Sequence, residues 1–119
     1  MAVSNQTPRR DFEIHRGAPQ PIVIQKRVSG TLQAFDSSLR FRAFYGSTTI
    51  NLTVGSGITL ASAESVSNAR ATITISETQS RLVPDGSLMV YEIEMGSPGA
   101  ETPVLMGRLI GVGGYNADD

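Results

Sequence analysis

Cysteine and tryptophan are absent from this sequence of 119 residues, and histidine occurs once. Without cysteine the chain has no disulfide and no thiolate ligand for a metal ion, and the cysteine count leaves its redox compartment open. The single histidine, His15, cannot form a multi-histidine metal site, and no serine or cysteine nucleophile motif accompanies it. We therefore expect His15 to be a surface or interface residue, and we expect no cofactor and no metal.

Charge is also scarce. The chain has 10 Lys and Arg residues against 11 Asp and Glu residues. A nucleic-acid-binding domain normally has a strongly basic surface, so we expect no nucleic-acid partner. No apolar run reaches the length of a membrane span, and the N-terminal residues lack the apolar segment of a secretory signal. We therefore expect synthesis in a cytoplasm and no interaction with a membrane.

The chain is instead rich in short stretches in which apolar and polar residues alternate, and the clearest lies between Ala69 and Met95. Alternation with a period of two is typical of a strand with one buried face. It predicts one strand that ends near Ile75 and a second strand around Tyr91. The side chains expected to face inward in this unit are those of Ala69, Ala71, Ile73, Ile75, Tyr91, Ile93 and Met95.

Two motifs join these strands. Ser76 and Gln79 have the spacing of a capping box, which predicts a short helical turn over Ser76–Arg81. The Pro-Asp-Gly sequence at 84–86 predicts a reversal of the chain, because proline presets φ and glycine accepts a positive φ. The unit is therefore expected to be a strand, a helical turn, a tight corner and a second strand.

Further strands are expected on both sides of this unit. The alternation over Ser38–Tyr45 predicts a strand with Tyr45 among its inward residues, whereas Ala61–Asn68 is interpreted as a polar connection. The segment from Gly107 to Gly114 lacks phosphate-loop spacing, and Gly111, Gly113 and Gly114 are interpreted as a flexible exit from the last strand. The other expected strands lie at residues 12–15, Pro21–Val28, Thr48–Val54, Ile58–Leu60 and Thr102–Val112.

About seven to eight short antiparallel strands with almost no helix predict an all-β fold, namely a single immunoglobulin-like β-sandwich with one short helical turn. A closed barrel is the alternative, because periodicity does not distinguish the two. The expected boundaries are an N-terminal arm over residues 1–10, the sandwich domain over residues 11–112 and a C-terminal tail over residues 113–119. Such polar terminal segments become ordered when a neighbour binds them.

Two groups of residues have side chains that could take part in chemistry or binding. Glu92 and Glu94 would lie about 7 Å apart on one strand face, which could serve glycoside hydrolysis or a calcium ion, but a solvated face that protects the strand is preferred. Arg40 and Arg42 share a face with Phe44, the minimum for binding single-stranded nucleic acid. Pairing with the two glutamates across the sheet, or contact with another subunit, is preferred. We expect no enzymatic activity and no small-molecule substrate.

Several of these segments resemble small β-sandwich proteins encoded among phage and prophage tail genes. The resemblance rests on the Arg-Gly pair at 16–17, on the Asp-Ser-Ser turn at 36–38 that leads into LRFRAF, and above all on TITISETQSRLVPDGSLMVYEIEM. In that family a capped turn precedes a Leu-x-Pro-x-Gly corner, a strand with a tyrosine such as Tyr91, and a last strand that begins near a glycine such as Gly107. The resemblance covers residues 11–112 and departs from the usual pattern at residues 18–21 and 29–30.

Members of such families are structural parts of virions. The resemblance therefore implies a non-enzymatic component of a bacteriophage virion, first of all a tail, baseplate or tail-fibre adaptor subunit located in the virion. The alternatives are a capsid-decoration or head–tail connection protein and a free carbohydrate- or cell-surface-binding module. The expected partners are other virion proteins and copies of the chain itself. The residues expected to bind them are Arg9, Arg10, Arg40, Arg42, Phe44 and Tyr115.

Overall fold

The computed structural model of the protein describes residues 8–113, except for the side chain of Ser87. Within this range it contains ten strands and one four-residue helix, so the expectation of an all-β protein is confirmed. The elements are β1 (Phe12–His15), β2 (Gln20–Ile24), β3 (Lys26–Val28), β4 (Thr31–Gln33), β5 (Arg40–Tyr45), β6 (Thr48–Val54), β7 (Gly57–Ala63), β8 (Val66–Ile75), α1 (Glu77–Ser80), β9 (Gly86–Met95) and β10 (Thr102–Val112).

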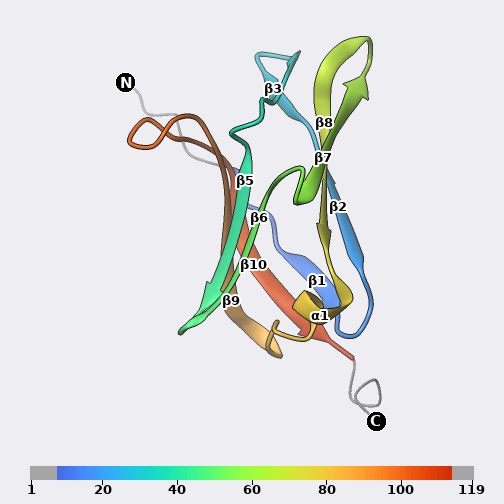
Figure 1. Cartoon of the computed structure of the whole chain (residues 1–119), viewed down its shortest axis with the longest axis vertical. Helices are drawn as coiled ribbons and strands as arrows, with labels where there is room; N and C mark the ends of the chain where they lie inside the picture. The colour runs from blue at the N-terminus through green and yellow to red at the C-terminus, as the bar shows by residue number, and fades with distance from the viewer. Residues whose placement is uncertain (1–7, 114–119) are drawn as a thin grey trace.

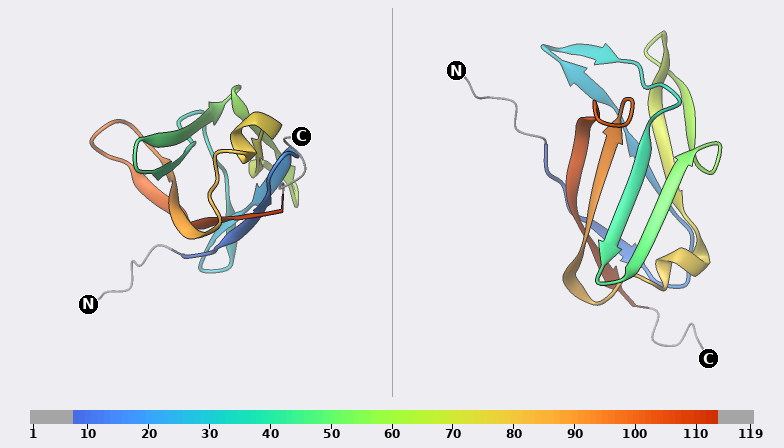
Figure 2. Two further views of the ribbon diagram at one scale, coloured as in Figure 1. Left: turned by 90° about the horizontal axis from the view of Figure 1, so that it is seen from below. Right: turned by 60° about the vertical axis from the view of Figure 1, so that its left-hand side comes forward.

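Eight strands form one continuous sheet in the order β1-β10-β9-β5-β6-β7-β8-β2, and this sheet curls into a nearly closed barrel. Strands β5, β9 and β10 lie on one side of the molecule, with β2, β7 and β8 on the other (Figure 1). The end-on view in Figure 2 shows the strands arranged around the interior. The remaining strands, β3 and β4, form a separate two-stranded hairpin.

The strand pairing corrects the expectation of seven to eight antiparallel strands. Strand β1 pairs with β10 in parallel, and β6 pairs briefly with β7 in parallel. Between β6 and β7 the chain turns sharply at Gly55, where φ is 90°, and Thr53 and Ser56 exchange two backbone hydrogen bonds of 3.0 and 2.9 Å. Periodicity in a sequence shows which residues share a face, but it does not encode strand direction or pairing partner.

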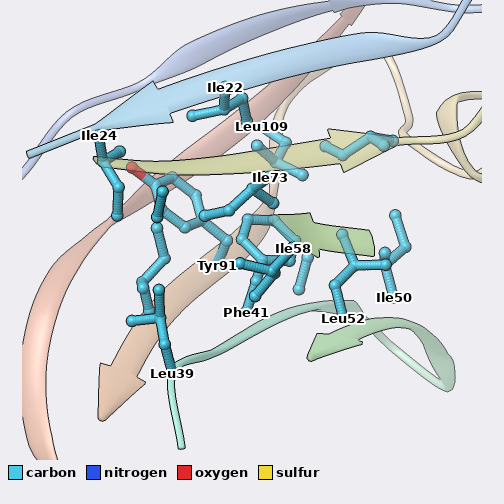
Figure 3. Packing of buried hydrophobic residues seen from close by; sticks show 14 of the residues in the cluster. Ile22, Ile24, Leu39, Phe41, Ile50, Leu52, Ile58, Ile73, Tyr91 and Leu109 are labelled. Atoms are coloured by element: carbon cyan, nitrogen blue, oxygen red, sulfur yellow. The ribbon is translucent and has the colours of Figure 1, made fainter. Parts of the chain in front are cut away.

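Most residues predicted to face inward are buried in the barrel interior (Figure 3), but Ala69 is buried in a separate small cluster and Met95 is only partly buried. Tyr91 lies at the centre of the interior, with its ring stacked on Phe41 at 5.5 Å between centroids and tilted against Phe12 at 5.7 Å. The predicted inward position of Tyr45 is wrong, because its side chain is 45% exposed. Tyr45 is the last residue of β5, paired with Thr48 next to the turn, so it lies at the end of the strand and its side chain stays exposed.

The segment 61–68 was expected to be a polar connection, but it forms the end of a long hairpin of β7 and β8. Its turn consists of Glu64 and Ser65, with φ of 51° and 68°. Two successive positive φ values are typical of a type I′ hairpin turn, for which Asn-Gly is the usual sequence signal. The hairpin was missed because two non-glycine residues occupy these positions.

The β3–β4 hairpin packs beside the end of the β7–β8 hairpin, and together they form what we call the flap (residues 26–33 and 61–69). The prediction of one strand over Pro21–Val28 is therefore wrong: β2 ends at Ile24, and Lys26–Val28 turns at Ser29-Gly30, with φ of 51° and 82°, into a separate tight hairpin with β4. A separate small cluster of Leu32, Ala63 and Ala69 is buried between the two hairpins of the flap.

The predicted capping box is confirmed. The backbone N–H of Gln79 donates to Ser76 Oγ at 3.1 Å, and the backbone N–H of Ser76 donates to Gln79 Oε1 at 3.0 Å. Ser76 and Arg81 are the caps of α1, so the predicted turn over Ser76–Arg81 consists of the helix and its two caps. The capped turn connects β8 and β9 at one end of the barrel (Figure 1).

Candidate functional site

The segment that precedes β1 lies against β10. The Arg10 N–H donates to the Met106 carbonyl at 2.9 Å, and the Met106 N–H donates to the Pro8 carbonyl at 3.1 Å. The guanidinium of Arg10 lies over the ring of Phe12 at 5.1 Å, and Arg9 Nη1 lies 4.0 Å from the Met106 sulfur. The expected arm therefore overlaps the sheet at residues 8–10, and its first seven residues lie outside the described range.

Tyr91 and Gly107 hold this segment in place. The Tyr91 hydroxyl donates to the Arg10 carbonyl at 2.6 Å, and burial is the main reason that the pKa of Tyr91 is raised. A Cβ atom at Gly107 would lie 2.0 Å from the same carbonyl oxygen, so only glycine permits the close approach. Both residues belong to the resemblance motif, and both have structural roles. A glycine inside a strand is the sequence signal for such an approach.

Arg16, from the Arg-Gly pair of the resemblance, closes one end of the barrel. Its Nη2 lies 3.0 Å from Asp85 Oδ1 in the Pro-Asp-Gly corner. The same guanidinium donates to the carbonyls of Val83 and Gly113, at 3.4 and 3.2 Å. One side chain therefore connects the end of β1, the corner before β9 and the end of β10.

Gly17 and Gly111 complete this connection. The Gly17 N–H donates to Ser80 Oγ at 2.9 Å, and the Ser80 hydroxyl donates to the Glu77 carbonyl at 2.6 Å. Gly111 lies within β10, and a Cβ atom there would meet the carbonyl oxygens of Val83 and Pro84 at 2.5 and 2.7 Å. The interpretation of Gly111 as part of a flexible exit is therefore wrong. We call this group the clasp: Arg16, Gly17, Ser80, Asp85 and Gly111.

The candidate functional surface is the outward face of β5 and β9, which run side by side in the right-hand view of Figure 2. Their antiparallel register places three pairs of outward residues in successive rows. Strand β5 contributes the basic and aromatic residues that the sequence pointed to, and β9 contributes the two glutamates. The rows are Arg40 opposite Glu94, Arg42 opposite Glu92, and Phe44 opposite Val90.

In the Arg40 row, the arginine has its charge and hydrogen-bond partners within the chain. Arg40 Nη2 lies 3.5 Å from Glu94 Oε1 and 2.9 Å from Glu101 Oε2, and its side chain is only 24% exposed. Its Nη1 also donates to the Gly96 carbonyl at 3.3 Å. The pKa of Glu101 is lowered, chiefly by hydrogen bonds from its own backbone N–H and that of Gly99, with a smaller effect of Arg40. The expected pairing across the sheet is therefore present here, and Arg40 has a structural role.

The Arg42 row differs from it. Arg42 is exposed and Glu92 is partly exposed, although the two face each other in register. Among residues 8–113 neither side chain has an ion-pair partner within 4.0 Å. Two opposite charges thus stand side by side on the face without a close partner, which leaves both available to another molecule.

Apolar side chains continue this face beyond the charged rows. Phe44 is 39% exposed and lies opposite the partly exposed Val90, and Leu88 is 54% exposed. Leu88 is two residues from Val90 on β9, so it is a diagonal neighbour of Phe44, within reach of an aromatic ring. The three side chains form an apolar end to the face. The sequence pointed to Phe44, but not to Leu88, whose strand it placed only around Tyr91.

The other candidate residues lie elsewhere. His15 is exposed on β1, as expected. Tyr115 lies outside the described residues. Within residues 8–113 no group of three or more His, Asp or Glu residues could hold a metal ion, and no helix has the length and hydropathy needed to cross a membrane.

No protein-family model matches the chain, and no curated protein matches it in sequence.

Proposed function

We propose that the protein is a non-enzymatic structural component of a bacteriophage virion, a tail, baseplate or tail-fibre adaptor subunit that docks through the outward face of β5 and β9. The observation that carries the proposal is the combination of Arg42 and Glu92, which have no ion-pair partner among residues 8–113, with the exposed Phe44 and Leu88 on one face. Exposed apolar residues gathered on one side of a protein are typical of interaction sites. The expected location is the virion.

The roles of the resemblance motifs support this proposal. Arg16, Gly17, Tyr91 and Gly107 all stabilise the barrel and its clasp, through the contacts described above. Residues that a virion family shares for building a rigid block should have such structural roles. A shared catalytic motif would instead place reactive groups in a cleft.

The proposal includes an immunoglobulin-like sandwich as the finer description of the fold. Strands β10, β9, β5 and β6 follow the order of the G, F, C and C′ strands of a variable-type domain, and β2, β8 and β7 follow the order B, E and D. The strand order and the short capped turn before β9 support this description. In the sandwich description, β6 and β7 are the edge strands of two packed sheets. The short β6–β7 pairing at the corner near Gly55 joins these edges, which makes the two sheets one nearly closed barrel.

The test is light scattering of the purified protein, alone and mixed with the products of neighbouring genes. We expect the wild-type protein to join a defined larger particle, and Phe44→Asp to prevent this. Val23→Asp is the matched control, because Val23 is also an exposed apolar residue, 52% exposed, but lies on β2. Failure of the wild-type protein to join any particle, or normal assembly of Phe44→Asp, would contradict the proposal.

A carbohydrate- or cell-surface-binding module is a second candidate, and the corrected position of Tyr45 favours it. Tyr45 follows Phe44 and is 45% exposed, so two adjacent aromatic residues are accessible at the end of β5. Exposed aromatic side chains are the usual stacking surface for sugars. Binding to a glycan array that is lost in Tyr45→Ala, together with no assembly in the scattering experiment, would favour this second candidate.

A further inference from the structure

We infer that the partner of the β5–β9 face is a second copy of the chain, packed face to face across a two-fold axis that runs parallel to the two strands. The inference rests on the proposed docking role of this face and names the molecule that occupies it. It starts from the register of the three rows, in which each residue of β5 stands opposite a residue of β9 at the same height.

The symmetry operation determines which residues meet. A two-fold axis that lies between the copies, parallel to the strands and midway between β5 and β9, places β5 of one copy over β9 of the other without any shift along the strands. Arg42 then lies over Glu92 of the second copy, and Phe44 lies over Val90 of the second copy. An interface of this kind uses the same patch on both copies, so each contact occurs twice.

The charges make this arrangement self-complementary. In the Arg42 row each copy contributes one positive and one negative side chain, side by side. Stacking by the two-fold axis produces a square of alternating charges, in which every arginine lies next to a glutamate both within its own copy and across the interface. Packed sheets lie about 10 Å apart, and long side chains reaching from both sheets can meet across this distance.

The apolar row supplies the contact area. Phe44 and Leu88 are exposed. Val90, which is opposite Phe44 and two residues from Leu88, is partly exposed. In the stacked pair this row is covered from both sides, which removes its apolar surface from water. The Arg40 row lies at the other end and keeps its internal partners Glu94 and Glu101, so it forms a polar border that needs no rearrangement.

Charge complementarity favours a second copy over an unrelated partner. A partner surface of one sign would place a like charge over either Arg42 or Glu92, and like charges that meet across an interface cost several kcal/mol. A suitable partner must carry the opposite charges in mirrored order, with an apolar surface at the same height. The same face of a second copy meets all three requirements.

The experiment measures the mass of the whole chain by analytical ultracentrifugation over a wide range of protein concentration. We expect a monomer–dimer equilibrium for the wild-type protein. Arg42→Glu should give a square of four negative charges and Glu92→Arg a square of four positive charges. Each variant alone should dimerise at least about tenfold more weakly, a change of about 1.4 kcal/mol.

A mixture of the two variants gives the decisive measurement. A copy with Arg42→Glu stacked on a copy with Glu92→Arg has opposite charges at both positions, so the mixture should form a heterodimer. The double variant R42E/E92R should also dimerise as the wild-type protein does. Arg70→Glu is the control, because Arg70 is exposed on β8 and its replacement changes the net charge by the same amount. Circular dichroism of every variant shows whether it is folded.

The outcomes separate this inference from the proposed function. A wild-type protein that stays monomeric at every concentration overturns the second copy as partner, even if Phe44→Asp still prevents assembly with neighbouring gene products. A dimer that does not respond to the charge variants, or variants whose mixture stays monomeric, overturns the geometry. A dimer that responds as expected supports the inference even if no larger particle forms, in which case the proposed function fails alone.

Discussion

The barrel with its clasp and the flap are held together very differently. The barrel has a large cluster of buried side chains around Tyr91, and the clasp connects three chain segments through Arg16. The flap has three buried apolar residues and an exposed ion pair between Arg27 and Glu64. Regions with few buried contacts open at lower free energy than the rest of a protein. We therefore expect the flap to open while the barrel stays folded.

The largest expected difference comes from truncating the same side chain in both regions. Leu39 is fully buried in the barrel, whereas Leu32 belongs to the small flap cluster. Leu39→Ala should lower the free energy of unfolding by about 4 kcal/mol, and Leu32→Ala by about 2 kcal/mol, because a shallow site can collapse around the lost volume. Urea denaturation measures both. Equal losses would mean that the flap is part of one cooperative core.

Two glycines give the next comparison. A Cβ atom at Gly111 in the clasp would meet two backbone oxygens, whereas one at Gly30 in the flap would meet nothing within 4 Å. Gly111→Ala should therefore cost about 3 kcal/mol, because the backbone itself must move. Gly30→Ala should cost only about 1–2 kcal/mol, the strain of an alanine at a φ of 82°. Thermal unfolding of both variants measures the difference, and a smaller loss for Gly111→Ala would show that the clasp can relax.

The smallest effects should come from the two arginine ion pairs. The Arg16 side chain is 19% exposed and the Arg27 side chain 44% exposed. Arg16→Ala should cost about 1–2 kcal/mol, mainly because the carbonyls of Val83 and Gly113 lose a donor. Arg27→Ala should cost no more than about 0.5 kcal/mol, as is usual for exposed pairs. Denaturation at low and high salt checks this, and an equal cost would show that the flap pair stabilises the fold as much as the clasp does.

The outward face could be predicted only in part. Alternation placed Arg40, Arg42 and Phe44 on one side of a strand, and it placed Glu92 and Glu94 together on another strand. It could not show which arginine stands opposite which glutamate, because register depends on how two strands distant in the sequence pack. The structure separates Arg40, which has partners within the chain, from Arg42, which has no ion-pair partner among residues 8–113.

The sequence by itself determined the central strands and the capped turn of this protein. Period-two alternation identified the buried residues of the central strands, and Ser76 with Gln79 predicted the capped turn, because these signals depend only on neighbouring residues. The tertiary structure alone decided where the core ends, which left Tyr45 exposed, and which backbone segments cross closely, which made Gly107 and Gly111 necessary. It also decided the parallel pairing of β1 with β10, since contacts between the two ends of a chain leave no periodic signal in either.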